Sequence, residues 1–199
     1  SQPVFVECNA IAPATTRRIA TILESVSFVD GGIIGGPPRA GTQDPSHGPR
    51  FYVSGPQAQR VARMADFGLD IAVLDGPVGA ASGLKLAYAG LTKGFTALAA
   101  AMVNAAARDG LADALRVELA RTQPEILARL DRFVPQMFPK AYRWVAEMAQ
   151  IAEFVGRPAD GATIYEGAAR LYEELAAQFA GDTAAVSLER LAAFCKRSD

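Results

Sequence analysis

The feature that most constrains the fold of this chain is a long apolar segment, residues 81–108, that carries one stripe of polar side chains. Nearly all of its residues are Ala, Leu, Gly, Phe, Met or Val. A helix that is apolar on its other sides is expected to be buried, and it carries two ammonium groups only where a polar cleft receives them. The pattern therefore predicts a helix that lines a site. The polar residues recur at three- and four-residue steps along one helix face, and they are Ser82, Lys85, Tyr88, Thr92, Lys93, Thr96 and Asn104.

Lys85 is the candidate proton-transfer group of this helix. It lies one to two turns after the expected helix start, where unpaired N–H groups and the positive end of the helix dipole disfavour a second positive charge. Partial burial acts in the same direction, so we expect a lowered pKa in the range useful for proton transfer. From spacing alone, a lysine that simply extends from a buried helix to solvent is an equally good interpretation.

Strand and helix signals divide the chain into residues 1–78 and residues 79–199. The first part alternates the two signals, with strands expected over 4–8, 27–34, 51–54 and 71–74 and helices over 13–25 and 57–67. The second part has only helix signals, over 81–108, 110–121, 124–133, 139–155, 162–180 and 183–196. We therefore expect an α/β domain followed by an all-α domain.

Composition argues against several classes of protein. The 199 residues include 20 basic and 21 acidic side chains, so no overall charge favours nucleic acid or an acidic membrane surface as a partner. Cys8 and Cys195 make neither a disulfide framework nor a metal cluster, and the carboxylates lack metal-ligand spacing, so we predict no metal. With two cysteines and no disulfide framework, a reducing cytoplasm is the expected compartment, and no secretory signal peptide is visible in the sequence. The uncharged stretch 94–107 is about two-thirds of a membrane span and is expected to pack inside the protein.

Four landmarks follow one another in a characteristic order. They are the strand segment 5–13, the glycine-rich segment 27–38, the segment 50–56 and the lysine helix. Their order and spacing resemble the β-hydroxyacid dehydrogenase and 6-phosphogluconate dehydrogenase superfamily. The closer resemblance is to its phosphogluconate dehydrogenase NAD-binding-like branch, which has a small C-terminal helical domain. It is carried by Leu84-Lys85-x-Ala-Tyr88, Thr92-Lys93-Gly94 and Arg143-Trp144-x-x-Glu147-Met148.

This resemblance implies an architecture and an activity. Residues 1–78 match the later part of a Rossmann-like nucleotide domain, and residues 79–199 match a helical substrate-binding and dimerisation domain. The activity would be hydride transfer between NAD or NADP and a small alcohol, in a homodimer, with Lys85 as general acid and base. Asn9 and Ala10 match the nicotinamide side of the cofactor site. The positions that match substrate contacts are Gly35, Gly36, Tyr88, Ala89, Thr92, Lys93, Trp144 and Glu147.

Departures from the superfamily pattern limit the prediction. Many hydroxyacid dehydrogenases carry serine at the position of Ile34 and asparagine at the position of Ala89, so the substrate is expected to differ. The glycine-rich dinucleotide-binding turn is not found in this sequence, so the activity is expected of a longer parent protein and not of this chain alone.

Two alternative functions therefore stay open, a non-catalytic helical dimerisation module and a small-ligand-binding protein. Four individual residues also have interpretations that involve no functional site. Arg143 and Glu147 are spaced for an ordinary ion pair within one helix, Asp30 for capping a turn, and His47 for a solvated loop position.

Overall fold

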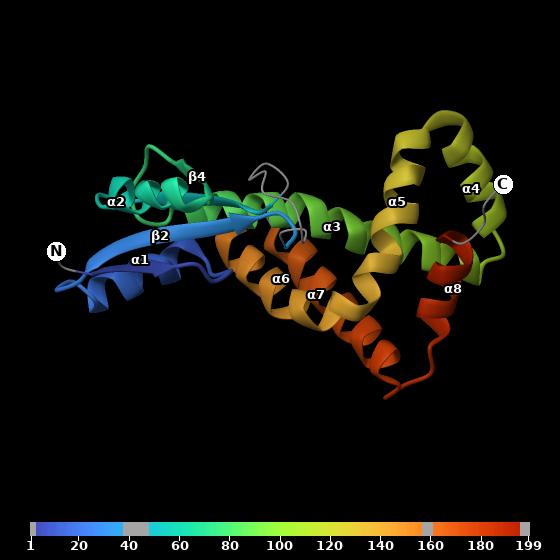
Figure 1. Cartoon of the computed structure of the whole chain (residues 1–199). Coiled ribbons are helices and arrows are strands. Elements are labelled where there is room, and N and C mark those ends of the chain that lie inside the picture. The colour runs from blue at the N-terminus through green and yellow to red at the C-terminus, as the bar shows by residue number, and fades with distance from the viewer. Residues whose placement is uncertain (1–2, 38–47, 157–160, 196–199) are drawn as a thin grey trace. The chain divides into compact units, whose positions relative to one another are not determined.

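The computed structural model describes residues 3–37, 48–156 and 161–195 (Figure 1). They form two compact units, Ser1–Ala89 with Glu153–Val155, and Gly90–Ala152 with Gly156–Asp199. This division falls within the long helix α3 (Ala80–Arg108), whereas the sequence pattern places a domain boundary between residues 78 and 79. That boundary stays a prediction, and the two units are described separately.

A small mixed sheet forms the centre of the first unit. Its strands are β1 (Val4–Glu7), β2 (Ser27–Ile34), β3 (Arg50–Ser54) and β4 (Asp70–Val73), in that order across the sheet. β1 is parallel to β2, β2 is antiparallel to β3, and β3 is parallel to β4. The first half of β2 pairs with β1 and the second half with β3. Asp30 is therefore opposite the last residue of both neighbours, Glu7 and Ser54.

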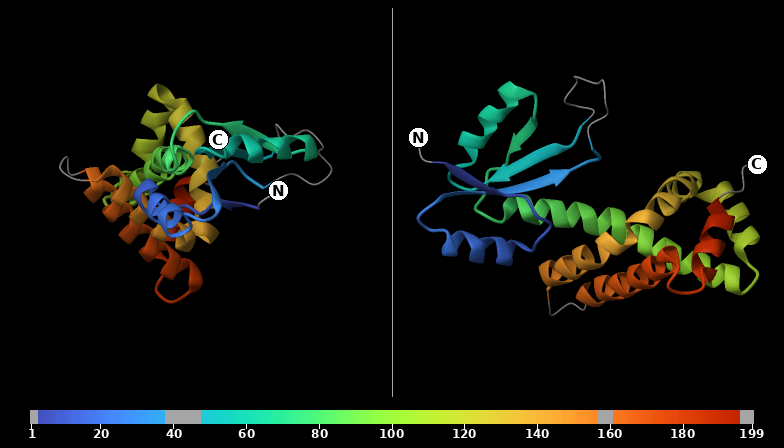
Figure 2. Two further views of the ribbon diagram at one scale, coloured as in Figure 1. Left: turned by 90° about the vertical axis from the view of Figure 1, so that its left-hand side faces the viewer. Right: turned by 60° about the horizontal axis from the view of Figure 1, so that its bottom comes forward.

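Two sides of this sheet are covered by helices. The buried side chains of Val29 and Val53 pack with Ala58 and Val61, the latter two on α2 (Ala58–Ala62). Because side chains alternate along a strand, Asp30, which follows Val29 in β2, faces the opposite side of the sheet. Figure 2 shows α2 on one side of the sheet and α1 (Pro13–Ile22) on the other. A short 3₁₀ helix, η2 (Arg63–Phe67), connects α2 to β4.

The second unit consists of helices alone within its described residues. After α3 come α4 (Ala112–Thr122), α5 (Pro124–Met137), the 3₁₀ turn η3 (Phe138–Lys140), α6 (Ala141–Val155), α7 (Gly161–Ala180) and α8 (Val186–Cys195). α5 packs against α4 and α8, and α7 packs against α8. The fully buried members of this core include Val134, Met137, Met148, Ile151, Tyr172, Leu175 and Leu191.

The α/β unit followed by helices confirms the expected fold class. One expected boundary differs for a clear reason. The sequence pattern ends the fifth helix at Phe133, but α5 continues to Met137 with Pro135 inside it. The missing N–H of Pro135 affects only the last turn, and the burial of Val134 and Met137 stabilises the added residues.

α3 is also long and apolar enough to span a membrane, by length and composition, and it is the one such helix in the described part of the chain. Its most apolar window has a mean hydropathy of 1.3, and 39% of that window is buried by the rest of the protein. The core helix of a soluble protein meets the same criterion, so this finding is weak evidence for a membrane span.

Candidate functional site

Lys85 extends from the second turn of α3 to the end of β1. Its Nζ donates a hydrogen bond to the main-chain carbonyl oxygen of Cys8 at 3.1 Å. The side chain is half-buried. Cys8 directly follows the last residue of β1, Glu7, so the ammonium group lies where the strand ends. The lysine thus has a defined partner within the first unit.

Two glycines of β2 permit this close approach. A Cβ atom on Gly32 would lie 2.6 Å from the carbonyl oxygen of Ala81 and 3.3 Å from Cβ of Lys85. A Cβ atom on Gly31 would lie 2.6 Å from Sγ of Cys8. The contact at Gly32 is with the main chain of α3, so this position requires glycine, whereas the closest atom at Gly31 is the end of the Cys8 side chain. The sequence analysis matched only Gly35 and Gly36 of this segment to substrate contacts, and it missed the packing role of Gly32.

The two residues matched to the cofactor site, Asn9 and Ala10, directly follow Cys8. The Asn9 amide Nδ2 and main-chain N both donate to Oε1 of Glu7, at 2.6 Å and 2.7 Å. This buried carboxylate therefore fixes the turn after β1, and it leaves the asparagine exposed. Lys85, Cys8 and Asn9 are brought together at one end of one strand.

The other residues of the first unit predicted to contact substrate occupy different settings. Gly35 and Gly36 are exposed just beyond β2, and the positive φ of Gly35, 120°, favours glycine. Tyr88, on the same helix as Lys85, is exposed, whereas the next residue, Ala89, is buried. The contacts described for Lys85 involve Cys8 and Gly32. Assignment of these four residues to a substrate site stays a prediction.

A second cluster of predicted residues lies in the second unit. Lys93 of α3 forms an ion pair with Glu147 of α6, and both side chains are largely shielded from solvent. The Lys93 ammonium also lies 5.2 Å from the ring centroid of Trp144, a cation–π arrangement. The Trp144 ring meets the ring of Tyr172 edge to face at 5.2 Å. The structure brings Lys93, Trp144 and Glu147 together, and their assignment to a substrate site stays a prediction.

Tyr172 was missed by the sequence analysis. Its hydroxyl donates a 2.5 Å hydrogen bond to the main-chain carbonyl of Lys93. Burial, and then the nearby negative charge of Glu147, raise the pKa of Tyr172 well above its ordinary value, so the phenol stays protonated and remains a donor. A tyrosine in an amphipathic helix is usually interpreted as a residue of the hydrophobic core, and no sequence pattern marks Tyr172 as a partner of Lys93.

Two other polar groups have partners that differ from simple sequence expectations. Glu147 pairs with Lys93, and within the described residues no ion pair joins it to Arg143 on its own helix. Thr96, another member of the polar stripe, donates back to the carbonyl oxygen of Thr92 at 3.0 Å. Thr92 lies one residue before Lys93, and its predicted role stays a prediction. His47 lies outside the described residues.

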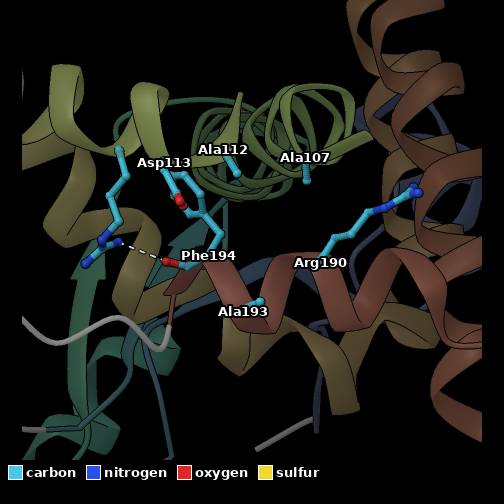
Figure 3. A pocket seen from close by; sticks show the side chains of 7 residues that line it. Ala107, Ala112, Asp113, Arg190, Ala193 and Phe194 are labelled. Atoms are coloured by element: carbon cyan, nitrogen blue, oxygen red, sulfur yellow. Dashed lines mark hydrogen bonds between the residues drawn. The ribbon is translucent and has the colours of Figure 1, made fainter. Parts of the chain in front are cut away.

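A small cavity of about 120 Å³ occurs elsewhere in the second unit (Figure 3). None of the predicted site residues lines it. The Arg116 guanidinium is engaged there by Asp131 at 2.8 and 3.1 Å and by the carbonyl oxygen of Phe194 at 3.1 Å. The Arg190 guanidinium points away from Phe194 in Figure 3. This cavity is therefore separate from the predicted site residues.

The cysteine near Lys85 is not an activated thiol. Burial raises the pKa of Cys8, and the positive charge of Lys85 opposes that shift only in part. Among residues 3–37, 48–156 and 161–195, no group of three or more His, Cys, Asp or Glu residues could hold a metal ion. The absence of a metal stays a prediction for the whole protein.

Comparison with known protein sequences identifies two similarities. Residues 106–175 match a family described as a domain of unknown function, DUF1932. The uncharacterized 28.5 kDa protein in the 7S RNA 5′ region of Methanothermus fervidus is 28% identical over 153 residues, which are 76% of this chain and 58% of that protein. The chain therefore spans less than two-thirds of the length of this relative.

Two solved structures are similar to this chain. One is a conserved protein of unknown function whose structure is described as similar to 3-hydroxyacid dehydrogenases. It has a TM-score of 0.66 and 26% identity, over 87% of this chain and 66% of that one. The other is a conserved hypothetical protein from Sinorhizobium meliloti 1021, with a TM-score of 0.73 and 22% identity, over 98% of this chain and 66% of that one. The second likeness is evidence for the fold alone.

Proposed function

Because the chain belongs to the β-hydroxyacid dehydrogenase and 6-phosphogluconate dehydrogenase superfamily, we propose that it is the substrate-binding portion of an NAD(P)-dependent oxidoreductase. Its fold is of the dehydrogenase type. In this proposal the enzyme transfers a hydride between a nicotinamide cofactor and a small secondary alcohol or related substrate. Lys85 serves as the general acid and base.

One observation carries this proposal. The Lys85 ammonium group meets the Cys8 carbonyl oxygen at the end of β1, directly before Asn9 and Ala10. The superfamily resemblance assigns Lys85 to proton transfer, and it assigns Asn9 and Ala10 to the nicotinamide side of the cofactor site. These two assignments were made from separate segments of the sequence, and the fold brings the segments together.

Lys85 would handle the proton of the reaction. Oxidation of an alcohol removes the hydroxyl proton while a hydride leaves the same carbon, and a neutral lysine amine in reach of the hydroxyl accepts that proton. In the reverse direction the ammonium form returns it to the carbonyl oxygen. The Cys8 carbonyl can accept one ammonium N–H, which fixes the direction of the side chain and leaves other N–H bonds for the substrate oxygen.

The described residues fit one end of the cofactor. Asn9 is exposed and polar, and its conformation is fixed by Glu7, which suits a residue that meets a carboxamide. When bound, the nicotinamide would supply or accept the hydride. Asn9 and Ala10 would hold its ring side, while the choice between NAD and NADP depends on residues that bind the ribose.

The substrate would contact further residues of the proposed site. Tyr88, Ala89, Thr92 and Lys93 follow Lys85 along α3 and, with Gly35, Gly36, Trp144 and Glu147, match the substrate positions of the superfamily. Ala89 offers no polar group where many hydroxyacid dehydrogenases have asparagine, so we expect a substrate with a different polar pattern from the common small hydroxyacids.

The test is a titration of the longest form of the protein that its gene encodes. NADH and NADPH are titrated by fluorescence, and turnover is screened on a panel of secondary alcohols and hydroxyacids. We expect saturable binding of one nucleotide and turnover that Lys85→Ala abolishes. Lys140→Ala, which removes an exposed lysine, is the matched control and is expected to keep full turnover.

The same experiment separates the alternatives. A folded full-length protein that binds neither nucleotide would contradict the oxidoreductase proposal and favour a helical assembly module or a ligand-binding protein. If the protein binds a nucleotide and turnover persists in Lys85→Ala, the protein is still an oxidoreductase, but Lys85 is not its general acid and base. A small-ligand-binding protein without redox activity would show neither cofactor oxidation nor reduction.

We also propose that the protein is a cytoplasmic homodimer. Leu91, Leu98 and Met102 of α3 are 75%, 61% and 55% exposed, and their spacing places them on one helix face. An exposed row of large apolar side chains on an apolar helix supports burial against a second copy. Cys8 and Cys195 are both free, which supports a reducing compartment.

A further inference from the structure

A buried aspartate of β2 holds the beginning of α3. Asp30 is 0% exposed, and its carboxylate accepts four hydrogen bonds. Oδ2 accepts from Ser54 Oγ at 3.0 Å, from the main-chain N of Gly79 at 2.9 Å and from the main-chain N of Ser82 at 3.0 Å. Oδ1 accepts from the hydroxyl of Ser82 at 2.5 Å. The carboxylate thus binds a neighbouring strand and the first turn of the helix at the same time.

From this geometry we infer that Asp30 is a positioning residue for Lys85, because it fixes the first turn of α3 against β2 and thereby sets where the lysine ammonium lies. The inference rests on the function proposed for Lys85. Lys85 follows Ser82 by three residues and so lies on the same side of the helix. Gly32, two residues after Asp30, touches the same helix turn.

Asp30 also aligns the partner of the lysine. In the sheet it pairs with Glu7, the residue directly before Cys8, whose carbonyl oxygen accepts from Lys85. One residue therefore fixes both ends of the lysine–carbonyl hydrogen bond, through the strand ladder on one side and the helix N-terminus on the other. A shift of about 1 Å in such a group can cost on the order of 100-fold in rate.

Surrounding hydroxyls make the arrangement rigid. The Ser54 Oγ that donates to Asp30 accepts in turn from the main-chain N of Ala81 at 3.0 Å. Thr16 Oγ1 of α1 lies 3.1 Å from Ser82 Oγ. Capping one helix end needs only one or two acceptors. Here the same carboxylate also recruits a strand hydroxyl, and a fully satisfied buried network of this kind specifies one geometry.

The test replaces Asp30 by asparagine and follows Lys85 directly. Asp30→Asn keeps the size of the side chain but replaces one acceptor oxygen with an NH₂ donor, which cannot accept from N–H groups. Ser54→Ala is a milder second variant that removes one hydroxyl of the network. Asp70→Asn is the matched control, because Asp70 forms an exposed pair with Arg50 at 2.8 Å on β3 and β4.

Lysines are reductively methylated with ¹³C-formaldehyde, and each dimethyl-lysine signal is recorded by NMR. The sequence holds only four lysines, so the Lys85 signal is assigned by its loss in Lys85→Ala. We expect Asp30→Asn and Ser54→Ala to shift the Lys85 signal while the Lys93 signal stays in place. In both variants the methylation rate of Lys85 should rise by up to about tenfold, because loss of one hydrogen bond makes local opening more frequent by about that factor. Asp70→Asn should leave all signals unchanged.

Kinetics provide the second measurement, on the substrate identified with Lys85→Ala. We expect Asp30→Asn to lower kcat by about 10- to 100-fold with KM nearly unchanged, since misplacement affects the reacting group. An unaltered Lys85 signal in a folded Asp30→Asn protein would overturn the inference and leave Asp30 as a structural cap. If Asp30→Asn does not fold, an unaltered signal in Ser54→Ala would overturn it in the same way. If the Lys85 signal shifts but turnover does not change in Lys85→Ala, Asp30 does position Lys85, and the proposed catalytic role of Lys85 is wrong.

Discussion

The half-buried thiol of Cys195 shows how a single group makes folding depend on pH. Burial, and then the charge of Asp131, raise its pKa from 9.0 to about 11, while Arg116 acts in the opposite direction. A group with a raised folded pKa stabilises the fold fully below its unfolded pKa, and this contribution is lost as the pH rises through the folded pKa. We therefore expect the contribution of Cys195 to stability to be present at pH 8 and to disappear between about pH 9 and 11.

The same shift predicts a slow reaction with disulfide reagents. In a Cys8→Ser variant, where Cys195 is the single thiol, the folded protein at pH 8 holds up to about 100-fold less thiolate than an unfolded thiol does. We expect its reaction with 5,5′-dithiobis(2-nitrobenzoate) to be slower than in urea by up to that factor, and to accelerate as the pH approaches 11. Equal rates in the folded and unfolded protein at pH 8 would contradict the raised pKa of this thiol.

At the residue scale, the sequence predicted the donor of the central hydrogen bond but not its acceptor. Lys85 stands out because a charged residue interrupts an apolar helix at a defined step. Every residue carries a main-chain carbonyl, so nothing in the sequence marks that of Cys8 as the partner of Lys85. Asp30 was interpreted as a turn cap. It does cap a helix start, but that helix begins nearly fifty residues later in the chain, at a distance that local patterns do not cover.

At the scale of helices, the Lys93–Glu147 pair joins α3 to α6 within the second unit. Its charges are largely shielded from water, and Tyr172 of α7 donates to the Lys93 carbonyl. Removing one charge of a shielded pair leaves the other without its partner. We expect Glu147→Gln to lower the free energy of unfolding by about 1–3 kcal/mol, as for loss of a hydrogen bond to a charged group.

Chemical denaturation measures this change, and Glu166→Gln on α7 is the matched control. Glu166 is exposed, so its substitution should stay within about 0.5 kcal/mol of the wild type. If Glu147→Gln is equally silent, the pair contributes nothing to stability, and a role for Lys93 and Glu147 in substrate binding gains weight.

Helix and strand positions were predictable because periodicity and turn residues agree along most of the chain. The eight-residue strand β2 was predicted with its observed limits, and Pro13 begins α1 as its fixed φ favours. The continuation of α5 through Pro135 was not predictable. It depends on burial of Val134 and Met137 by other helices, and tertiary packing of that kind outweighs the local cost of proline near a helix end.

At the scale of the whole molecule, alternation of strands and helices followed by helices alone was sufficient to predict the fold class. The pairing within the sheet was not, because β1 and β3 each cover half of β2 in opposite directions. That arrangement ends both partner strands at Asp30, beside the glycines that admit α3. A hydrophobic pattern predicts the inward face of each strand, but it contains no information on which strands pair or on where along β2 each partner strand ends.

The proposed homodimer leads to a prediction about the exposed row of α3. Leu98 lies between Leu91 and Met102 on one helix face, and a lysine in the middle of a buried apolar interface loses its hydration without gaining a partner. We expect the wild-type protein to have twice the monomer mass by light scattering at micromolar concentration. Leu98→Lys should weaken dimerisation by at least about tenfold, as substitution at an interface centre typically does.

Val117→Lys provides the control, since Val117 is 69% exposed on α4 and is not part of this row. It introduces the same charge and should leave the dimer intact, which separates an effect at the interface from a general effect of added lysine. A monomeric wild-type protein would contradict the proposed homodimer. A dimer that Val117→Lys dissociates and Leu98→Lys does not would move the interface from α3 to α4, and the apolar row of α3 would then need another explanation for its exposure.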